Sequence, residues 1–283
     1  MATIAQMIIW AGKELESSSE TPMLDARVIL AHVLGKDSVY VMTERDVTVP
    51  RAHEWAFRNA IERRKKGTPI AYITGMKEFM GMDFRVSESV LIPRADTEVL
   101  VEKAILILRG RKEAKVLDLC CGSGAIGLSI AKFIDGAHVV LADISQEAIG
   151  VSRENAVMLG LDGRVEFVVS DLFESVYGKY DLIASNPPYI SGRDMEALPK
   201  DVADFEPHGA LYGGEDGLDF YRKITENAIS RLSKGGVLIF EIGYDQGDEV
   251  MEIMKRNGFK GIQLLRDLSG RPRVVFGELV PET

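Results

Sequence analysis

From Lys115 onward, strand-like and helix-like segments alternate along this chain, and no other feature of the sequence constrains its fold so strongly. Apolar runs rich in Val, Ile and Leu are separated by longer stretches whose apolar residues have helical spacing. The runs read KVLDLC, HVVLADI, VEFVVSD, YDLIASN and GGVLIFEIG, followed by GIQLLRDL and RPRVVFGEL. This pattern predicts an α/β fold, a mostly parallel sheet with helices on both faces. Only Ser269 and Gly270 separate the last two runs, which we expect to form an antiparallel hairpin.

Two other patterns precede the sheet. Apolar residues recur with helical spacing over residues 1–67, which predicts a bundle of roughly four or five helices. Residues 68–92 turn toward β-branched and aromatic types and indicate a short β-hairpin, linking the bundle to an α/β domain over residues 93–283. A later glycine-rich stretch, FEPHGALYGGEDGLDF, is expected to form a long surface loop.

Charge and cysteine usage exclude several classes of protein. The net charge of −9 disfavours binding by neutralisation of many phosphates, so we expect no direct nucleic-acid binding. No apolar run approaches the roughly 18 residues of a membrane span, and the N-terminus lacks the pattern of a signal peptide. Cys120 and Cys121 are adjacent, and no Cys/His cluster has metal-ligand spacing. We therefore expect a cytoplasmic protein without a metal site or a membrane partner.

A glycine-rich turn follows the first strand of the predicted sheet. Residues 122–127 read Gly-Ser-Gly-Ala-Ile-Gly, and Asp143 ends the next strand, about twenty residues later. Glycines allow a ligand to approach the backbone closely, and a carboxylate at this place accepts hydrogen bonds from both ribose hydroxyls. The pattern predicts an adenosine-containing cofactor, with a simple packed turn as the alternative.

Two further carboxylates bear on which cofactor this is. Asp118 precedes the glycines, where it would repel the diphosphate of a dinucleotide but favour a sulfonium or an amino group. S-adenosylmethionine (AdoMet) carries both groups, so we predict AdoMet. Asp171, followed by Leu172, ends the third strand and suits the amine and the face of adenine, although a capping role for Asp171 fits the sequence equally well.

The stretch Asn186-Pro187-Pro188-Tyr189 follows the fourth strand, at the edge where open α/β sheets bind ligands. Proline has no N–H, and a residue before proline is held extended, so this loop presents only acceptors. The Asn186 side-chain oxygen and the Pro187 carbonyl can each accept one hydrogen from an NH₂ group, while Tyr189 stacks on its planar carrier. The loop therefore predicts a neutral, planar NH₂ substrate whose developing positive charge the two oxygens stabilise.

In combination, these motifs resemble the HemK/PrmC family of protein-(glutamine-N5) methyltransferases. The likeness runs over nearly the full length and includes TPIAYITGMKEFMG, VLIPRADTE, LDLCCGSGAIGLSIA, SNPPYI, FEPHGALYGGEDGLDFYRKI and FEIG. The resemblance implies a Rossmann-like class I AdoMet-dependent methyltransferase sheet. It also implies methylation of the glutamine in the Gly-Gly-Gln tripeptide of class I peptide-chain release factors, which modulates translation termination, with the helical bundle docking the release factor.

The resemblance also implies which residues form the site. Those expected at the cofactor, with Asp118 added from the charge argument, are Cys120, Cys121, Gly122, Ser123, Gly124, Asp143, Asp171, Leu172 and Asn186. Those expected to hold the substrate glutamine are Asn186, Pro187, Pro188 and Tyr189, and of these Asn186, Pro187 and Tyr189 are the expected catalytic residues.

Two positions depart from the family pattern. The glycine motif usually begins Gly-Thr-Gly, whereas Cys120 and Cys121 occupy its first two positions here, so the backbone is expected to approach the methionine part of the cofactor slightly differently. The family's Pro-Arg-Pro-[Asp/Glu]-Thr-Glu reads with Ala95 after Arg94, which leaves the loop more flexible but keeps its charges.

Three further residues have expected roles, and for Arg94 and Glu241 an alternative stays open. Arg94 either holds the cofactor's carboxylate or the entering peptide, or it forms an ion pair with a neighbouring carboxylate, Asp96 or Glu98, which the sequence favours. Glu241 either faces the cleft or takes part in a hydrogen bond on the hairpin side. His208 is predicted to be a loop residue rather than a base.

Two other functions stay open. NPPY is shared with methyltransferases that act on adenine N6 or guanine N2 of nucleic acid, although the acidic composition counts against this function. The other is a protein that binds AdoMet without transferring its methyl group.

Overall fold

Residues 1–280, which the computed structural model describes, divide into two units that each have a hydrophobic core. One unit contains residues 1–76 together with residues 199–205, which lie far away in sequence. The other contains residues 77–198 and the described residues from 206 onward. The sequence-based boundaries at residues 67 and 92 stay a prediction.

The first unit is helical. Its elements are α1 (Ile4–Glu14), α2 (Pro22–Leu34), α3 (Ser38–Thr43), α4 (Arg51–Lys65), α5 (Ile70–Thr74) and α10 (Lys200–Ala203). A capping box starts α1, since the Thr3 hydroxyl accepts from Gln6 N (3.3 Å) and Gln6 Oε1 accepts from Thr3 N (2.9 Å). The helices α1 to α4 confirm the predicted bundle. Within residues 1–280, no helix has both the length and the apolar character needed to cross a bilayer.

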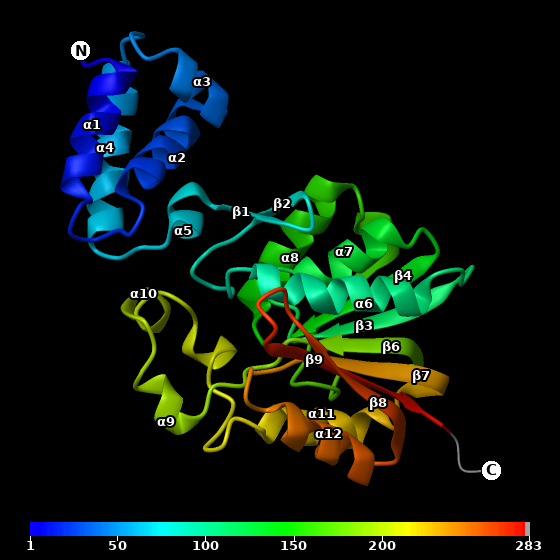
Figure 1. The fold of residues 1–283 in the computed structure, drawn as a ribbon. Helices are drawn as coiled ribbons and strands as arrows, with labels where there is room; N and C mark the ends of the chain where they lie inside the picture. The colour runs from blue at the N-terminus through cyan, green and yellow to red at the C-terminus, as the bar shows by residue number, and fades with distance from the viewer. Residues whose placement is uncertain (281–283) are drawn as a thin grey trace. The chain divides into compact units, whose positions relative to one another are not determined.

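The second unit is built on a seven-stranded sheet of order β5-β4-β3-β6-β7-β9-β8 (Figure 1). Its strands are β3 (Ala114–Leu119), β4 (Ala137–Asp143), β5 (Val165–Val169), β6 (Tyr180–Ser185), β7 (Leu232–Glu241), β8 (Phe259–Arg266) and β9 (Pro272–Leu279). β3 to β7 pair in parallel, whereas β9 pairs antiparallel to both β7 and β8. The predicted sheet and its C-terminal hairpin are confirmed.

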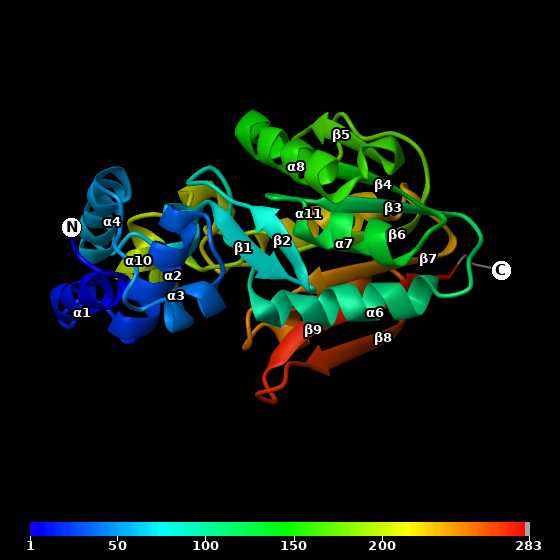
Figure 2. The same cartoon turned by 90° about the horizontal axis from the view of Figure 1, so that it is seen from above.

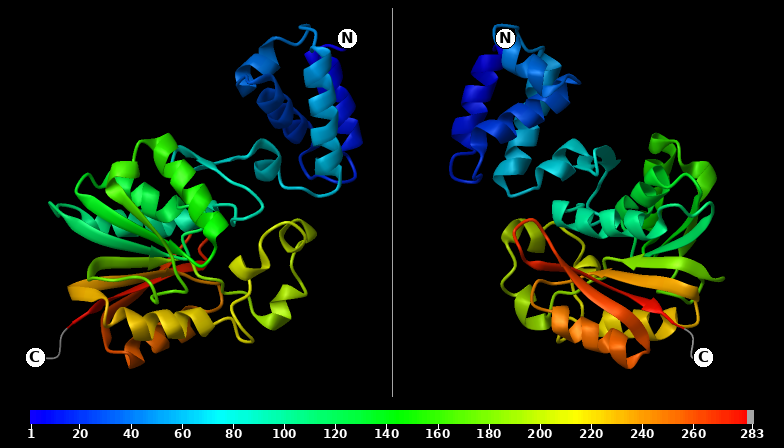
Figure 3. Two further views of the ribbon diagram at one scale, coloured as in Figure 1. Left: turned by 180° about the vertical axis from the view of Figure 1, so that it is seen from behind. Right: turned by 45° about the vertical axis from the view of Figure 1, so that its right-hand side comes forward.

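Helices cover both faces of this sheet. α6 (Glu98–Leu108), α7 (Ala125–Phe133) and α8 (Gln146–Leu159) lie on one face, and α11 (Asp219–Ala228) and α12 (Gly247–Arg256) on the other (Figures 1, 2 and 3). Alternate strand residues enter the two cores because successive side chains point to opposite faces. In β3, Val116 packs in the core with α6 and α7, and Leu117 in the core with α11 and α12.

Some local predictions were incomplete or wrong. The hairpin predicted within residues 68–92 forms from β1 (Met76–Phe79) and β2 (Met82–Arg85), but the helical turn α5 precedes it. The link between β8 and β9 spans residues 267–271 rather than two residues, because the Asp267 carboxylate accepts from the N–H groups of Ser269 and Arg271 and shapes a wider turn. α6 and the short helix α9 (Gly192–Met195) were not predicted.

The topology places a crevice beside β3. Strands β4 and β5 follow β3 on one side, and the chain then crosses to β6 on its other side. Ligands of open α/β sheets bind at such a switch point, outside the carboxyl ends of the strands. The glycine turn after β3 and the Asn-Pro-Pro-Tyr loop after β6 are therefore neighbours at this edge, as expected, since Leu119 and Ser185 are paired.

The close packing of α7 on the sheet gives a testable prediction. A Cβ added at Gly127 would clash with Leu141 and lie 3.0 Å from Asp118 Oδ2 and Val139 Cγ1. Gly127→Ala should therefore lower the free energy of unfolding by about 1–3 kcal/mol, measured by urea denaturation. Gly150 in α8 has open space around it, and Ala favours a helix more than Gly does. The matched Gly150→Ala should therefore raise the free energy of unfolding by up to about 1 kcal/mol. Equal effects of the two variants would contradict this packing.

Candidate active site

A cavity of about 530 Å³ lies at the carboxyl edge of the parallel strands. The turns after β3, β4, β5 and β6 line it, together with two segments that the sequence analysis did not place there. These are residues 89–97 before α6 and residues 207–214 before α11. Part of the stretch FEPHGALYGGEDGLDF, predicted as a surface loop, thus also forms a wall of the cavity, while its His208, Glu215 and Asp216 are exposed.

Asp143 joins the turns after β3 and β4. Its Oδ2 accepts from Gly122 N at 2.9 Å and its Oδ1 from Ser145 N at 3.0 Å. A carboxylate has about four lone-pair sites, so acceptor capacity remains for a ligand in the cavity, which Asp143 lines. Burial raises the pKa of Asp143, although these backbone hydrogen bonds oppose the shift. The arrangement fits the two hydroxyls of a ribose.

Two non-glycine residues at the cavity have a left-handed backbone. Cys120 has φ = 58° and Leu172 has φ = 47°, and both line the cavity. This conformation costs an L-residue roughly 1–2 kcal/mol, and such strain concentrates at ligand clamps. Cys120 therefore keeps the backbone shape that glycine provides at the first position of the family motif. Burial raises the pKa of the Cys120 thiol, so the neutral side chain forms part of the wall.

The other residues predicted at the cofactor divide into two groups. Cys121, Gly122, Ser123, Asp171, Leu172 and Asn186 all line the cavity. Asp118 and Gly124 do not, and Asp118 is fully buried with its Oδ2 accepting from Gly127 N at 2.8 Å. Burial raises the pKa of Asp118 to about 8. Asp118 thus holds the start of α7 behind the glycine turn, and its direct contact with the cofactor stays a prediction.

The Asn-Pro-Pro-Tyr loop has an inner and an outer side. Asn186 and Pro188 line the cavity, whereas Pro187 is buried and Tyr189 packs against the core under α11 and α12. The Tyr189 hydroxyl lies 3.5 Å from Oε1 of the buried Glu241, at the end of β7. Glu241 therefore lies behind Tyr189 and does not line the cavity, and burial raises its pKa to about 7. Stacking of Tyr189 on a substrate stays a prediction.

Arg94 lines the cavity, so its predicted contact with the cofactor or the peptide stays a prediction, and it also connects residues 89–97 to the segment before α11. Its guanidinium forms an ion pair with Glu206, whose side chain is 1% exposed and also accepts from Ile92 N at 3.4 Å. The pairing predicted with Asp96 or Glu98 is wrong, because Asp96 pairs with Arg273 (2.9 Å) and Glu98 accepts from Met80 N (2.7 Å). A long-range pair of this kind leaves no spacing signal in the sequence.

Further residues of the cavity wall come from these segments and from α11. They are Ser89, Val90, Leu91, Pro207, His208, Gly209, Ala210, Tyr212, Phe220 and Lys223. The available signal was the proline and three glycines of EPHGALYGG, which are typical of loops, where binding residues are often found. His208 lies in a 3₁₀ turn with its ring 5.7 Å from that of Tyr212.

The sheet order, the glycine turn held by Asp143 and the cavity at the switch point define a class I methyltransferase, a class that uses AdoMet as methyl donor. Residues 96–203 match the "Methyltransferase small domain", and residues 6–75 match the "PrmC N-terminal domain". A methyltransferase from Pyrococcus furiosus has the same fold, with a TM-score of 0.53 at 17% identity over 79% of this chain and 99% of that one.

Sequence relatives identify the family. The chain is 43% identical to a release factor glutamine methyltransferase of Clostridium acetobutylicum, over 92% of this chain and 93% of the relative. It is 39% identical to a protein of the same name from Clostridium botulinum, over 89% and 90% of the two chains. The chain belongs to the release factor glutamine methyltransferase family, as its motifs predicted.

The position of Asp143 predicts its effect on cofactor binding. Asp143→Ala removes the carboxylate that fits the ribose hydroxyls, so the affinity for AdoMet should fall at least about tenfold, as expected for a lost charged hydrogen-bond acceptor. Isothermal titration calorimetry measures this directly. Asp162→Ala, at an exposed position in a 3₁₀ turn, is the matched control and should bind AdoMet like the wild type. Equal affinity in both variants would remove Asp143 from the cofactor site.

The buried carboxyl of Asp118 predicts a pH dependence of stability. Its pKa is about 8 in the folded chain against 3.8 for an unperturbed Asp, so the folded state binds an extra proton between these values. Its contribution to the free energy of unfolding is therefore lost as the pH rises through this window. Asp118→Asn keeps the acceptor for Gly127 N but does not titrate. Urea denaturation should show a smaller loss of stability between about pH 5 and 8 in this variant. If the free energies of unfolding of the wild type and Asp118→Asn fell equally with rising pH, the buried position of Asp118 would be contradicted.

Proposed function

We propose that this protein transfers a methyl group from AdoMet to the side-chain amide nitrogen (N5) of the glutamine in the Gly-Gly-Gln motif of class I release factors, and so modulates translation termination. The proposal is supported by family membership and by one observation in particular. Asn186 and Pro188, from a loop rich in acceptors, line the same cavity as Asp143 and the glycine turn. An amide NH₂ held by the loop would thus lie beside the cofactor.

The chemistry required is activation of a poor nucleophile. Resonance holds the lone pair of an amide nitrogen, with a rotation barrier of about 18–20 kcal/mol. The Asn186 side-chain oxygen and the Pro187 carbonyl accept one N–H each, which favours a pyramidal nitrogen and stabilises the positive charge that develops on it. The cofactor supplies an electrophilic methyl carbon on a sulfonium.

Positioning completes the proposed mechanism. Alignment of the reacting atoms in a closed site contributes on the order of 7–11 kcal/mol toward the barrier. Asn186 is fixed by the end of β6, whose last residue Ser185 is buried and donates to Leu119 O at 2.8 Å. No strong base is needed: as the N–CH₃ bond forms, the S–CH₃ bond would break with S-adenosylhomocysteine as the leaving group, and the proton of the now cationic nitrogen would then pass to solvent. None of the described side chains has to deprotonate the amide first.

The partner and the place of action follow from the same proposal. The chain as a whole is acidic, but its first helical part is close to neutral, which suits docking of a protein better than clamping of nucleic acid. We assign this docking to the helical unit. Because release factors work at the ribosome, the protein is proposed to act in the cytoplasm, where its cysteines, both free, stay reduced.

The substrate is tested with labelled AdoMet. The wild-type protein is incubated with a class I release factor or with nucleic acid, and the product is digested and mapped by mass spectrometry. Label on the glutamine of Gly-Gly-Gln supports the proposal. Label on adenine N6 or guanine N2 would replace it with a nucleic-acid methyltransferase, and AdoMet binding without transfer would leave a cofactor-binding protein.

Asn186 gives the sharpest mutational test of this function. Asn186→Ala removes one of the two proposed acceptors, so turnover should fall by about 10²-fold or more while AdoMet affinity changes little. The matched control is Asn227→Ala, because Asn227 is exposed on α11 and its side chain donates only to Lys223 O there. Turnover and calorimetric affinity are measured for both. Near-normal turnover of Asn186→Ala would remove Asn186 from the mechanism.

A further inference from the structure

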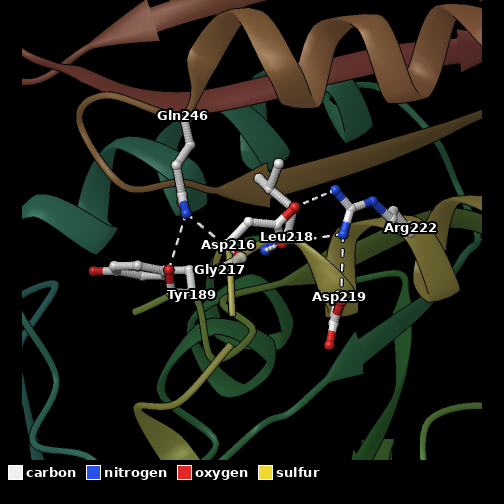
Figure 4. A network of polar contacts seen from close by, with 7 residues as sticks. All are labelled: Tyr189, Asp216, Gly217, Leu218, Asp219, Arg222 and Gln246. Carbon is white, nitrogen blue, oxygen red and sulfur yellow. Dashed lines mark hydrogen bonds and ion pairs between the residues drawn. The ribbon is translucent and has the colours of Figure 1, made fainter. Parts of the chain in front are cut away.

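The side-chain amide of Gln246 connects three segments behind the Asn-Pro-Pro-Tyr loop. Gln246 directly precedes α12, and Figure 4 shows it reaching to Tyr189 and Gly217. Its Nε2 donates to Tyr189 O at 2.9 Å and to Gly217 O at 3.3 Å. Its Oε1 accepts from Gly243 N at 3.0 Å and lies 3.4 Å from the Tyr221 hydroxyl, whose single hydrogen is closer to Glu241 O at 3.0 Å. Both amide hydrogens are thus used.

The bond to Tyr189 matters because this loop is short of hydrogen-bond donors. Pro187 and Pro188 have no N–H, so the tetrapeptide is held mainly through its carbonyls and side chains. On its C-terminal side, Ile190 N donates to Leu211 O, and Gly213 N donates to Ile190 O, both at 2.9 Å. The Gln246 amide holds the carbonyl directly before this bridge, and so fixes the end of the loop that does not adjoin β6.

Glycines show how closely the segments pack around this amide. A Cβ at Gly217 would clash with Tyr189 O and lie 2.6 Å from Gln246 Nε2, and Gly217 also has a left-handed φ of 73°. A Cβ at Gly213 would lie 2.7 Å from Pro188 O, and one at Gly243 would lie 2.7 Å from Gln246 Oε1. The segment before α11 and the residues after β7 can therefore approach the loop and the amide only because these three positions carry no side chain.

The segment that contains Gly217 is itself held in place. The Asp216 carboxylate accepts from Leu218 N at 3.1 Å and pairs with Arg222 at 2.5 Å, while Arg222 also contacts Asp219 at 3.3 Å (Figure 4). These contacts form a turn at the start of α11. Gln246 thus attaches the loop to a fixed turn on one side and, through Gly243, to the residues after β7 on the other.

We propose that Gln246 is a positioning residue for methyl transfer: by donating to the Tyr189 carbonyl, it holds the Asn186 and Pro187 oxygens where the substrate amide needs them. It touches neither substrate nor cofactor, since it does not line the cavity. This role rests on the proposed function. A displacement of about 1 Å in reacting groups costs up to about 10²-fold in rate, so a tether of the loop has a measurable kinetic effect.

Gln246→Glu isolates the donor function. The introduced carboxylate keeps an acceptor for Gly243 N, but it cannot donate to Tyr189 O or Gly217 O when ionised. We expect kcat to fall at least about tenfold, with the Kd for AdoMet within about twofold of wild type, because the cofactor side of the cavity is unchanged. Gln263→Glu, which adds the same charge at an exposed position of β8, should leave both quantities unchanged.

A second readout does not depend on activity. In the protein without ligands, amide hydrogen exchange at Ile190 and Gly213, whose N–H groups donate to Leu211 O and Ile190 O, should be at least about tenfold faster in Gln246→Glu, while exchange at Leu117 in β3 stays as in wild type. Unchanged exchange at Ile190 and Gly213, or a variant with wild-type kcat, would overturn the proposal. General destabilisation would show as faster exchange at Leu117 as well, and would also refute it. Because exchange is measured without substrate, failure of the proposed function is recognised separately, as absence of methylation by the wild type.

Discussion

Two consecutive prolines at the end of β6 are the constraint on which the site depends. They end the strand beside β3, at the point where the sheet opens, and leave a backbone that offers oxygens but few N–H groups. Such a backbone suits a ligand that brings its own hydrogens, and a carboxamide NH₂ brings two. The same property leaves the loop without donors of its own, so other parts of the fold must hold it in place.

The fold supports its two ligand loops in a similar way. Behind the glycine turn, the buried Asp118 accepts from Gly127 N at the start of α7. Behind the Asn-Pro-Pro-Tyr loop, the buried Glu241 faces the Tyr189 hydroxyl, and Gln246 holds the Tyr189 carbonyl. Burial raises the pKa of both carboxyls. These supporting side chains, Asp118, Glu241 and Gln246, do not line the cavity themselves.

The sequence predicted what local patterns determine. Alternating strands and helices gave the sheet and its two faces, and strand ends placed Asp143, Asp171 and Asn186 at one edge, where all three line the cavity. It failed where a residue's role depends on a partner distant in sequence. The Arg94 to Glu206 ion pair and the contacts of Gln246 have no spacing to reveal them, and the full burial of Asp118 behind the turn is likewise a tertiary property.

The most direct test of the central claim is a crystal structure with S-adenosylhomocysteine and a Gly-Gly-Gln peptide. The account predicts that the glutamine amide nitrogen lies roughly 2.7–3.2 Å from both the Asn186 side-chain oxygen and the Pro187 carbonyl, with its free face toward the sulfur. A complex in which these two oxygens bind other protein groups, or in which the glutamine amide lies away from them, would contradict it.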